Sequence, residues 1–116
     1  MENSSFKSPI RNSSFQMFHK ILQDDKKSRQ MEKDIYNSCI KYSSENSIVK
    51  NWENEIFKSL YLSRIRSIYT NLKTDSYLAN HTFKDKILND QIDPTKISSL
   101  SNYDIFPEVW EELLSK

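Results

Sequence analysis

The chain has 116 residues, enough for one domain with a real core and too few for two, and its 12% of aromatic residues can fill a small core. Its 17 basic and 16 acidic residues give a formal net charge of +1, which argues against binding to nucleic acid chiefly through phosphates, so any basic patch must be local. Glycine is absent and Cys39 is the only cysteine, which disfavours glycine loops that bind phosphate and excludes both an intrachain disulfide and a cysteine cluster that holds zinc.

The N-terminal part of the chain predicts a loose tail followed by a first helix. Residues 1–7 are polar and short, as is typical of a chain end. Ser8 before Pro9 predicts a helix N-cap with proline in the first turn, where its missing N–H costs nothing. The helix is expected to run to about residue 23, on an apolar stripe made by Ile10, Phe15, Met17, Phe18, Ile21 and Leu22.

A second helix of about four turns is predicted over residues 29–43. The polar run 23–27 is interpreted as a short connection, and Ser28 as the cap of the helix that follows. The polar residues 43–47 end the helix. Its apolar stripe is made by Met31, Ile35, Cys39 and Tyr42, and is widened by Tyr36 and Ile40.

A third helix is predicted over residues 53–73, where the helical periodicity is the clearest in the chain. The small apolar cluster just before it, Ile48, Val49 and Trp52, fits either a turn or the start of this helix. The apolar stripe of the third helix contains Ile56, Phe57, Leu60, Tyr61, Ile65, Ile68 and Leu72.

The last third of the chain predicts shorter helices. One is expected over residues 80–89 with Asn80 as its cap, and a brief one is expected to begin at Asp93 before Pro94. Ser101 and Asp104 resemble a capping box, and Pro107 opens a terminal helix. Because strand signals are essentially missing, the fold class is all-α. The apolar residues of these short helices are Phe83, Ile87, Leu88, Ile97, Leu100, Val109, Trp110, Leu113 and Leu114.

No set of side chains in the sequence resembles a catalytic or metal site. His19 and His81 have no cysteine or carboxylate arrangement that imitates a ligand set or a triad, so both are interpreted as structural or surface residues. Cys39 lies on an apolar stripe, where a free cysteine behaves as a small hydrophobe. We therefore expect that the chain is not an enzyme. The carboxylate pairs Asp24–Asp25 and Glu111–Glu112 are expected to be solvated.

Nothing in the sequence predicts export or a membrane span. No window approaches the roughly 20 apolar residues of such a span, and the N-terminus lacks the apolar core of a secretory signal. We expect a soluble intracellular protein.

The strongest candidates for partner binding are cationic residues of the third helix. Arg66 and Lys73 are seven residues apart, about two turns, so they fall on a common face, and Arg64 is expected a short rotation away. The three would form a cationic ridge. Trp52 and Trp110 are also able to anchor a partner, although packing is the favoured interpretation of both.

The residues around this ridge resemble the central domain of transcription elongation factor S-II, TFIIS. The similarity covers about residues 8–107. It rests on Tyr61, Arg64, Arg66, Ser67, Ile68, Tyr69, Asn71 and Leu72, then on Phe83, Lys84, Ile87, Ile92, Pro94, Ile97 and Leu100, and upstream on Ile10, Arg11, Met31, Glu32, Ile35 and Tyr36.

The chain departs from the family pattern in three places. The segment that contains Ile48–Trp52 is longer than in familiar cellular versions. Asn89 and Asp90, which tolerate left-handed φ best after glycine, stand where the family usually has a glycine. Residues 103–106 replace a frequent methionine. The long second-to-third helix region is similar to versions from large DNA viruses.

The resemblance implies a three-helix bundle with short additional C-terminal helices, spanning residues 8–116. It implies docking on the jaw and funnel side of the largest subunit of a multisubunit RNA polymerase, with Arg64 and Arg66 as main contacts, Lys73 in support, and only indirect contact with nucleic acid. Full-length factors continue into a zinc ribbon that stimulates cleavage of backtracked RNA. One cysteine cannot build that ribbon, so the resemblance implies either a fragment or a chain without the catalytic arm, with no cofactor of its own.

Two alternative functions stay open at this stage. The first is a TFIIS-like domain of a chromatin or RNA-processing regulator, which a Cys-x-x-Cys pair encoded soon after Lys116 would argue against. The second is a small helical nucleic-acid-binding domain. The expected location is the nucleus for a cellular version, and the host cytoplasm or virion for a viral one.

Overall fold

The computed structural model describes residues 8–73, 80, 82–105, 107 and 111, and its elements are all helices. No strand occurs within these ranges, so the predicted all-α class is confirmed, as is the three-helix bundle with short C-terminal helices. Of the predicted helix that opens at Pro107, the structure describes only Pro107 and Glu111, and both are helical. The elements are α1 (Pro9–Leu22), α2 (Asp25–Glu45), α3 (Glu55–Leu72), α4 (Phe83–Leu88), the 3-10 helix η2 (Pro94–Ser99) and α5 (Asn102–Ile105).

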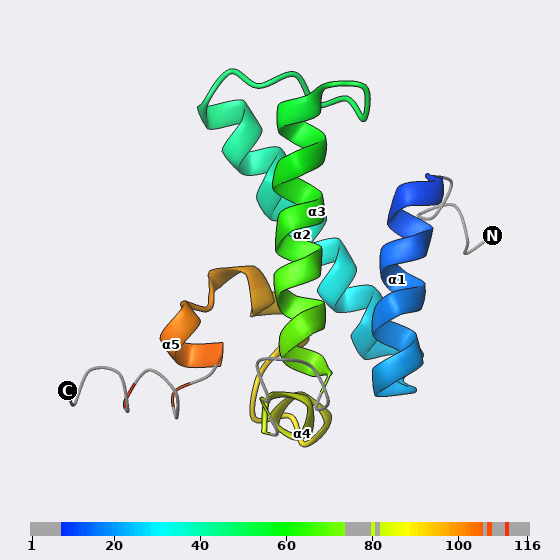
Figure 1. Ribbon diagram of the computed structural model, residues 1–116, viewed down its shortest axis with the longest axis vertical. Coiled ribbons are helices and arrows are strands. Elements are labelled where there is room, and N and C mark those ends of the chain that lie inside the picture. The colour runs from blue at the N-terminus through cyan, green and yellow to red at the C-terminus, as the bar shows by residue number, and fades with distance from the viewer. Residues whose placement is uncertain (1–7, 74–79, 81, 106, 108–110, 112–116) are drawn as a thin grey trace.

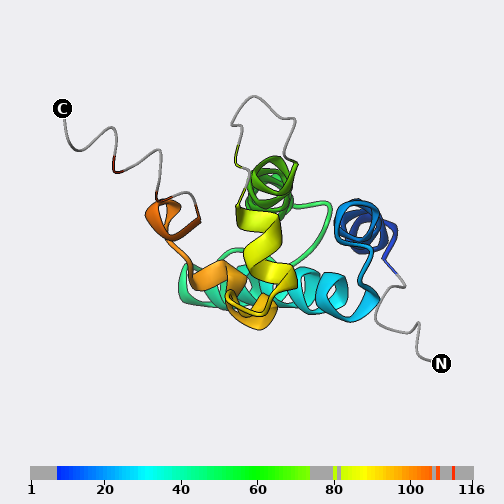
Figure 2. The same ribbon diagram turned by 90° about the horizontal axis from the view of Figure 1, so that it is seen from below.

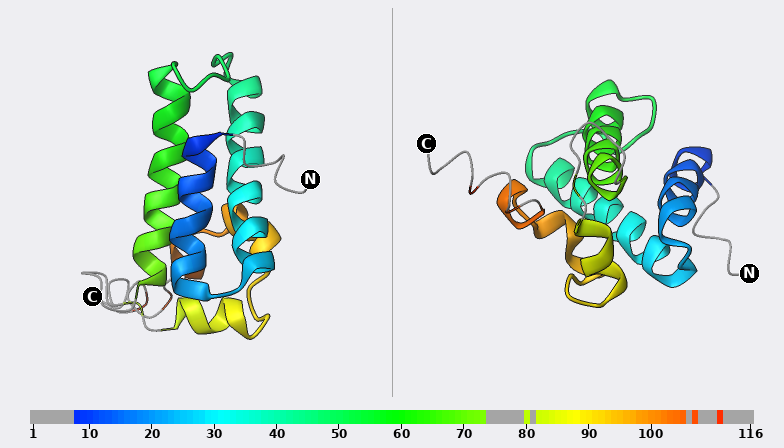
Figure 3. Two further views of the ribbon diagram at one scale, coloured as in Figure 1. Left: turned by 90° about the vertical axis from the view of Figure 1, so that its right-hand side faces the viewer. Right: turned by 60° about the horizontal axis from the view of Figure 1, so that its bottom comes forward.

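The three long helices pack against one another, and the short ones close one end and one side of the bundle. Figure 1 shows α1 and α5 on opposite sides of α3. Seen from below, α2 runs along one side of both α1 and α3 (Figure 2). The helix α4 lies across the end of the bundle, and η2 packs against α2 (Figure 3). The buried core is continuous from α1 to α5.

Most predicted helix starts are confirmed by the hydrogen bonds that satisfy the first N–H groups. The Ser8 hydroxyl accepts from the backbone N–H of Arg11 at 3.5 Å. The Asp93 carboxylate accepts from the N–H of Thr95 at 2.9 Å, just before Pro94. Asn54 caps α3 in the same way, although the sequence analysis did not identify it.

The predicted start of the fourth helix at residue 80 is wrong, because α4 begins at Phe83 and its N-cap residue is Thr82 rather than Asn80. The Asn80 side-chain oxygen accepts from the N–H groups of Thr82 and Phe83, each at 3.2 Å. The hydroxyl of Ser101 accepts from the N–H of Asp104, and the Asp104 carboxylate accepts from the N–H of Ser101 in return. The predicted capping box is therefore reciprocal.

The predicted start of the second helix is wrong. The helix α2 begins at Asp25 rather than residue 29, and Asp24 is its cap, because the Asp24 carboxylate accepts from the N–H of Lys27 at 2.9 Å. The polar run that was interpreted as a connection forms the first turn, where Asp25 also pairs with Arg29 at 2.7 Å. Ser28, the predicted cap, is completely buried inside the helix.

The apolar cluster between α2 and α3 belongs to a turn segment, not to α3, which begins at Glu55. Trp52 is half-buried there. Its ring lies 5.1 Å from the ring of Phe57 and 5.0 Å from that of Tyr61. Trp52 therefore fills the core edge, as the packing interpretation predicts, while Trp110 lies outside the described residues.

One buried carboxylate connects all three long helices. Glu32 of α2 has no exposed surface. Arg11 of α1 donates to its two carboxylate oxygens through Nε and Nη2, both at 2.8 Å, and the Tyr61 hydroxyl of α3 donates at 2.7 Å. The guanidinium also lies over the Tyr36 ring, 3.8 Å from its centroid. Burial and the negative charge of Glu32 raise the pKa of Tyr61, so its hydroxyl keeps the proton that it donates.

The helix ends compensate for the absence of glycine with non-glycine residues at positive φ. Ser47 follows α2 at φ 56°, and Asp90 follows α4 at φ 62°. The next residue along donates its N–H to the carbonyl five positions earlier in both cases, from Ile48 to Ser43 and from Gln91 to Lys86. These are Schellman motifs, which glycine usually ends. The prediction that Asp90 tolerates left-handed φ is confirmed.

We predict that Glu32→Gln destabilises the protein by about 3 kcal/mol or more, because it leaves the partly buried Arg11 guanidinium without a charged partner. Chemical denaturation followed by circular dichroism measures the loss. A paired replacement, Arg11→Met with Glu32→Met, should cost less than the sum of the two single changes, since neither charge is then left alone. Additive costs would show that the two side chains do not stabilise each other.

We also predict that Ser47→Gly raises the free energy of unfolding by about 0.5–1 kcal/mol, because relief of left-handed strain exceeds the entropy that glycine loses on folding. Ser59→Gly, at an exposed position inside α3, is the matched control and should lower stability by about 0.5 kcal/mol. Equal effects of the two changes in thermal denaturation would contradict this account of the α2 terminus.

Candidate functional site

The candidate site is the surface of α3, where the sequence predicts a ridge of three cations. The structure does not bring them together as one ridge. Two residues along a helix correspond to a rotation of about 200°, so Arg64 and Arg66 face different neighbours. Arg64 lies toward η2, whereas Arg66 lies beside α1. The expectation that Arg64 is only a short rotation from Arg66 is wrong.

The guanidinium of Arg64 forms hydrogen bonds within the domain. It is half-buried, and its Nη2 donates to the carbonyls of Ser98 and Leu100, each at 3.2 Å, and toward that of Ile97 at 3.4 Å. Asp34 of α2 secures the same segment, because its carboxylate accepts from the N–H of Ser98 at 2.7 Å. Arg64 and Asp34 together fix residues 97–100 against the bundle.

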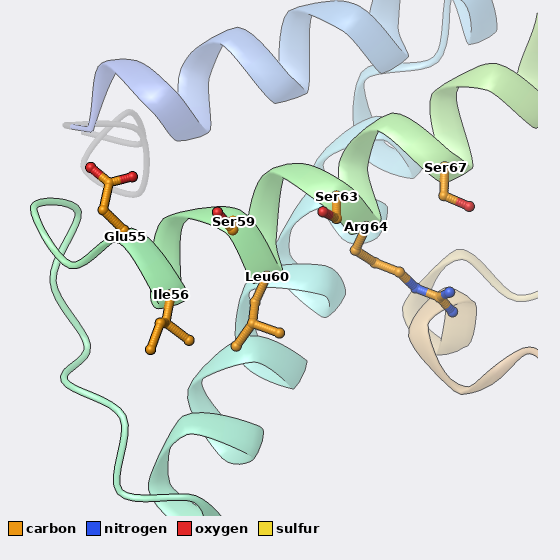
Figure 4. Close-up of a pocket in the computed structure, with 7 residues that line it drawn as sticks. All are labelled: Glu55, Ile56, Ser59, Leu60, Ser63, Arg64 and Ser67. Atoms are coloured by element: carbon orange, nitrogen blue, oxygen red, sulfur yellow. The ribbon is translucent and has the colours of Figure 1, made fainter.

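A shallow hollow of about 600 Å³ lies beside Arg64 along the outer side of α3. Figure 4 shows Ile56 and Leu60 pointing to one side of this hollow, while Arg64 extends away toward η2. Ile56 is 60% exposed, which is unusual for a large apolar residue on a packed helix. Tyr42 of α2 is 48% exposed and lines a smaller hollow with Leu60 and Arg64.

Arg66 is the exposed arginine of the pair. Its guanidinium forms no hydrogen bond or ion pair with any residue that the structure describes. It stands at the edge of a second hollow, of about 230 Å³, between α1 and α3. This hollow has an apolar floor, made by Ile10, Met17, Leu62 and Ile65.

Lys73, the third predicted cation, caps the end of α3 and is half-buried. Its ammonium group lies 5.6 Å from the centroid of the Tyr69 ring, within the range of a cation–π interaction. No ion pair joins this ammonium group to a carboxylate of the residues that the structure describes. Lys73 therefore keeps a positive charge at the α3 terminus, about two turns from Arg66.

The other sequence candidates take structural positions. Burial raises the pKa of Cys39 to about 11, although the positive charge of Arg64 opposes this, so the thiol stays protonated near neutral pH. His19 is half-buried beside the Phe15 ring, and His81 lies outside the described residues. Glu111 is exposed. Within the described ranges no group of metal-ligating side chains gathers, and no helix is both long and apolar enough to cross a membrane.

The sequence did not predict the structural roles of two residues that organise the site, Glu32 and Asp34. Glu32 was matched only as a family residue, yet it lies three residues before Ile35 on the stripe that faces the core, and a carboxylate at such a position signals a buried partner. Asp34 gives no local signal, because its partner, Ser98, lies 64 residues away.

We predict that Arg64→Ala lowers stability by about 1.5–3 kcal/mol, because the carbonyls of residues 97–100 lose a charged donor. Hydrogen exchange at the Ser98 amide should accelerate as the segment loosens. Arg66→Ala is the control and should change stability by no more than about 0.5 kcal/mol, since it removes no contact within the described residues. Equal stability of the two variants would contradict the structural role of Arg64.

Comparison with known proteins identifies the family. The chain matches the model of the transcription factor S-II (TFIIS) central domain over residues 6–116. No curated protein and no solved structure gives a significant match. The family match covers nearly the whole chain and agrees with the helical bundle described above. The chain therefore belongs to the family of TFIIS central domains, the part of a transcription elongation factor that binds RNA polymerase.

Proposed function

We propose that this domain docks on the jaw and funnel side of the largest subunit of a multisubunit RNA polymerase, with Arg66 of α3 as its main cationic contact and Lys73 in support. The observation that carries this proposal is the exposed Arg66 guanidinium, which has no partner among the described residues of a domain whose family binds polymerase. The guanidinium of Arg64 already binds backbone carbonyls of this domain, so we assign the main contact to Arg66. A direct contact of Arg64 with the polymerase stays a prediction.

The position of Arg66 suits recognition of an acidic protein surface. It extends from the middle of an 18-residue helix whose opposite face is buried, so its backbone is held in place before binding. A guanidinium donates two parallel hydrogen bonds to one carboxylate, which an ammonium group cannot reproduce. Arg66→Lys should therefore weaken binding even though the charge is kept.

Docking on the polymerase is distinct from stimulating the cleavage of backtracked RNA. The resemblance implies that stimulation of cleavage requires a zinc ribbon, and the single cysteine of this chain is buried in the bundle. We propose that these residues supply docking alone, without an enzymatic activity or cofactor of their own. The nuclear location of a cellular version, or the host cytoplasm or virion of a viral one, stays an expectation.

We predict that Arg66→Ala weakens binding to the RNA polymerase of the source organism by about tenfold or more, as expected for loss of a charged hot-spot residue. Arg66→Lys should fall between this variant and the unmodified chain. Biolayer interferometry with immobilised domain measures the three dissociation constants.

Lys41→Ala is the matched control, because Lys41 is an exposed cation of α2 on another face of the bundle. Its affinity should equal that of the unmodified chain. If Arg66→Ala binds as well as the Lys41 control, while circular dichroism shows both to be folded, the contact assigned to Arg66 is wrong.

A further inference from the structure

The near-neutral net charge conceals a separation of charge between helices. The helix α1 contains no carboxylate, and α3 contains only Glu55, in its first turn. The other 15 of the 16 acidic residues lie in α2 and in segments outside α1 and α3. One side of the bundle is therefore electropositive although the chain has a net charge of only +1. The cations of these two helices are Arg11, Lys20, Lys58, Arg64 and Arg66.

The cations of this side are not equally available. Arg11 is neutralised by Glu32, and Arg64 is turned toward η2. Lys20, Lys58 and Arg66 remain. Lys58 and Arg66 are each four residues from Leu62 along α3, so these two flank this side chain on one side of the helix. No ion pair joins either cation to a described carboxylate.

The hollow between α1 and α3 lies on the same side. Its floor is apolar, and its volume of about 230 Å³ is below the roughly 300–1,000 Å³ typical of sites for small-molecule ligands. A space of this size fits one large apolar side chain better than a cofactor. The rim carries the Arg66 guanidinium and the exposed Ser13 hydroxyl, both able to donate hydrogen bonds.

We propose that the hollow between α1 and α3 receives a large apolar side chain from an acidic segment of the polymerase, with carboxylates on either side of it pairing with Arg66 and Lys58. This inference rests on the proposed function and specifies the chemistry of the partner. Charge complementarity selects an acidic segment, and the net charge of only +1 favours a protein over a nucleic acid bound chiefly through its phosphates.

The first experiment fills the hollow without touching the cations. Ser13→Phe places a ring at the rim, while Gln16→Phe places the same ring at an exposed position of α1 that does not line the hollow. With the source organism's polymerase, Ser13→Phe should weaken binding by about tenfold or more, as loss of an anchor pocket does, and Gln16→Phe should bind like the unmodified chain. Equal binding by all three, or equal weakening by both variants, overturns the inference and leaves the proposed function standing.

A second experiment separates the two proposals if the unmodified chain does not bind polymerase, or if Ser13→Phe does not fold. The probe is a synthetic helical peptide that carries one phenylalanine, with a glutamate four residues before it and another four residues after it. The control peptide has glutamines in place of the two glutamates. The glutamate peptide alone should shift the NMR signals of Met17, Leu62 and Arg66. Arg66→Glu combined with Lys58→Glu should abolish the shifts with the glutamate peptide and give them with a peptide that carries lysines in place of the glutamates.

If the glutamate peptide gives these shifts but the domain does not bind polymerase, the hollow between α1 and α3 is supported as a docking site and the proposed function is refuted. Absence of these shifts, or identical shifts with the glutamine peptide, would overturn the inference. An RNA oligonucleotide that gives the same shifts, with an affinity that falls steeply with salt, would overturn it in favour of a nucleic-acid surface.

Discussion

The bundle depends on one buried carboxylate. Glu32 brings a negative charge into the core of α2, and this charge is tolerated only because Arg11 and Tyr61 arrive from α1 and α3 to satisfy it. An apolar core alone permits helices to slide and rotate, whereas a bidentate ion pair with a third hydrogen bond has one good geometry. The network joins α1 and α3 to the same side chain of α2, and together with the apolar core it holds the two helices that line the hollow.

The same physical reasoning distinguishes the two arginines of α3. Arg64 and Arg66 are nearly adjacent in sequence, yet one stabilises the C-terminal helices and the other is exposed. A change in affinity after replacing both would mix loss of a contact with loosening of residues 97–100. Family membership explains why the domain binds polymerase. The structure shows that Arg64 holds the C-terminal segment and that Arg66 is exposed, and the proposed function assigns the polymerase contact to Arg66.

The sequence predicted what is encoded locally. The helical period predicted α3, and the caps at Ser8, Asp93 and Ser101 form as expected, because each pairs with a backbone group at most three residues away. The start of α2 was missed because exposed first turns and connections are equally polar. The contacts of Glu32 and Arg64 join residues between 21 and 36 positions apart. The hollow between α1 and α3 likewise exists only because these two helices lie side by side in the fold. Periodicity contains no information about such pairs.

Arg64 recognises the backbone of the C-terminal segment, not its side chains. Carbonyl groups are common to all amino acids, so this contact places no demand on the side chains of Ser98 and Ser99, whereas Leu100 also packs against the core. The constraint falls instead on Pro94 and Ile97, which are buried, and on Arg64 itself. Substitutions at Ser98 and Ser99 can therefore leave these hydrogen bonds in place as long as the arginine is present.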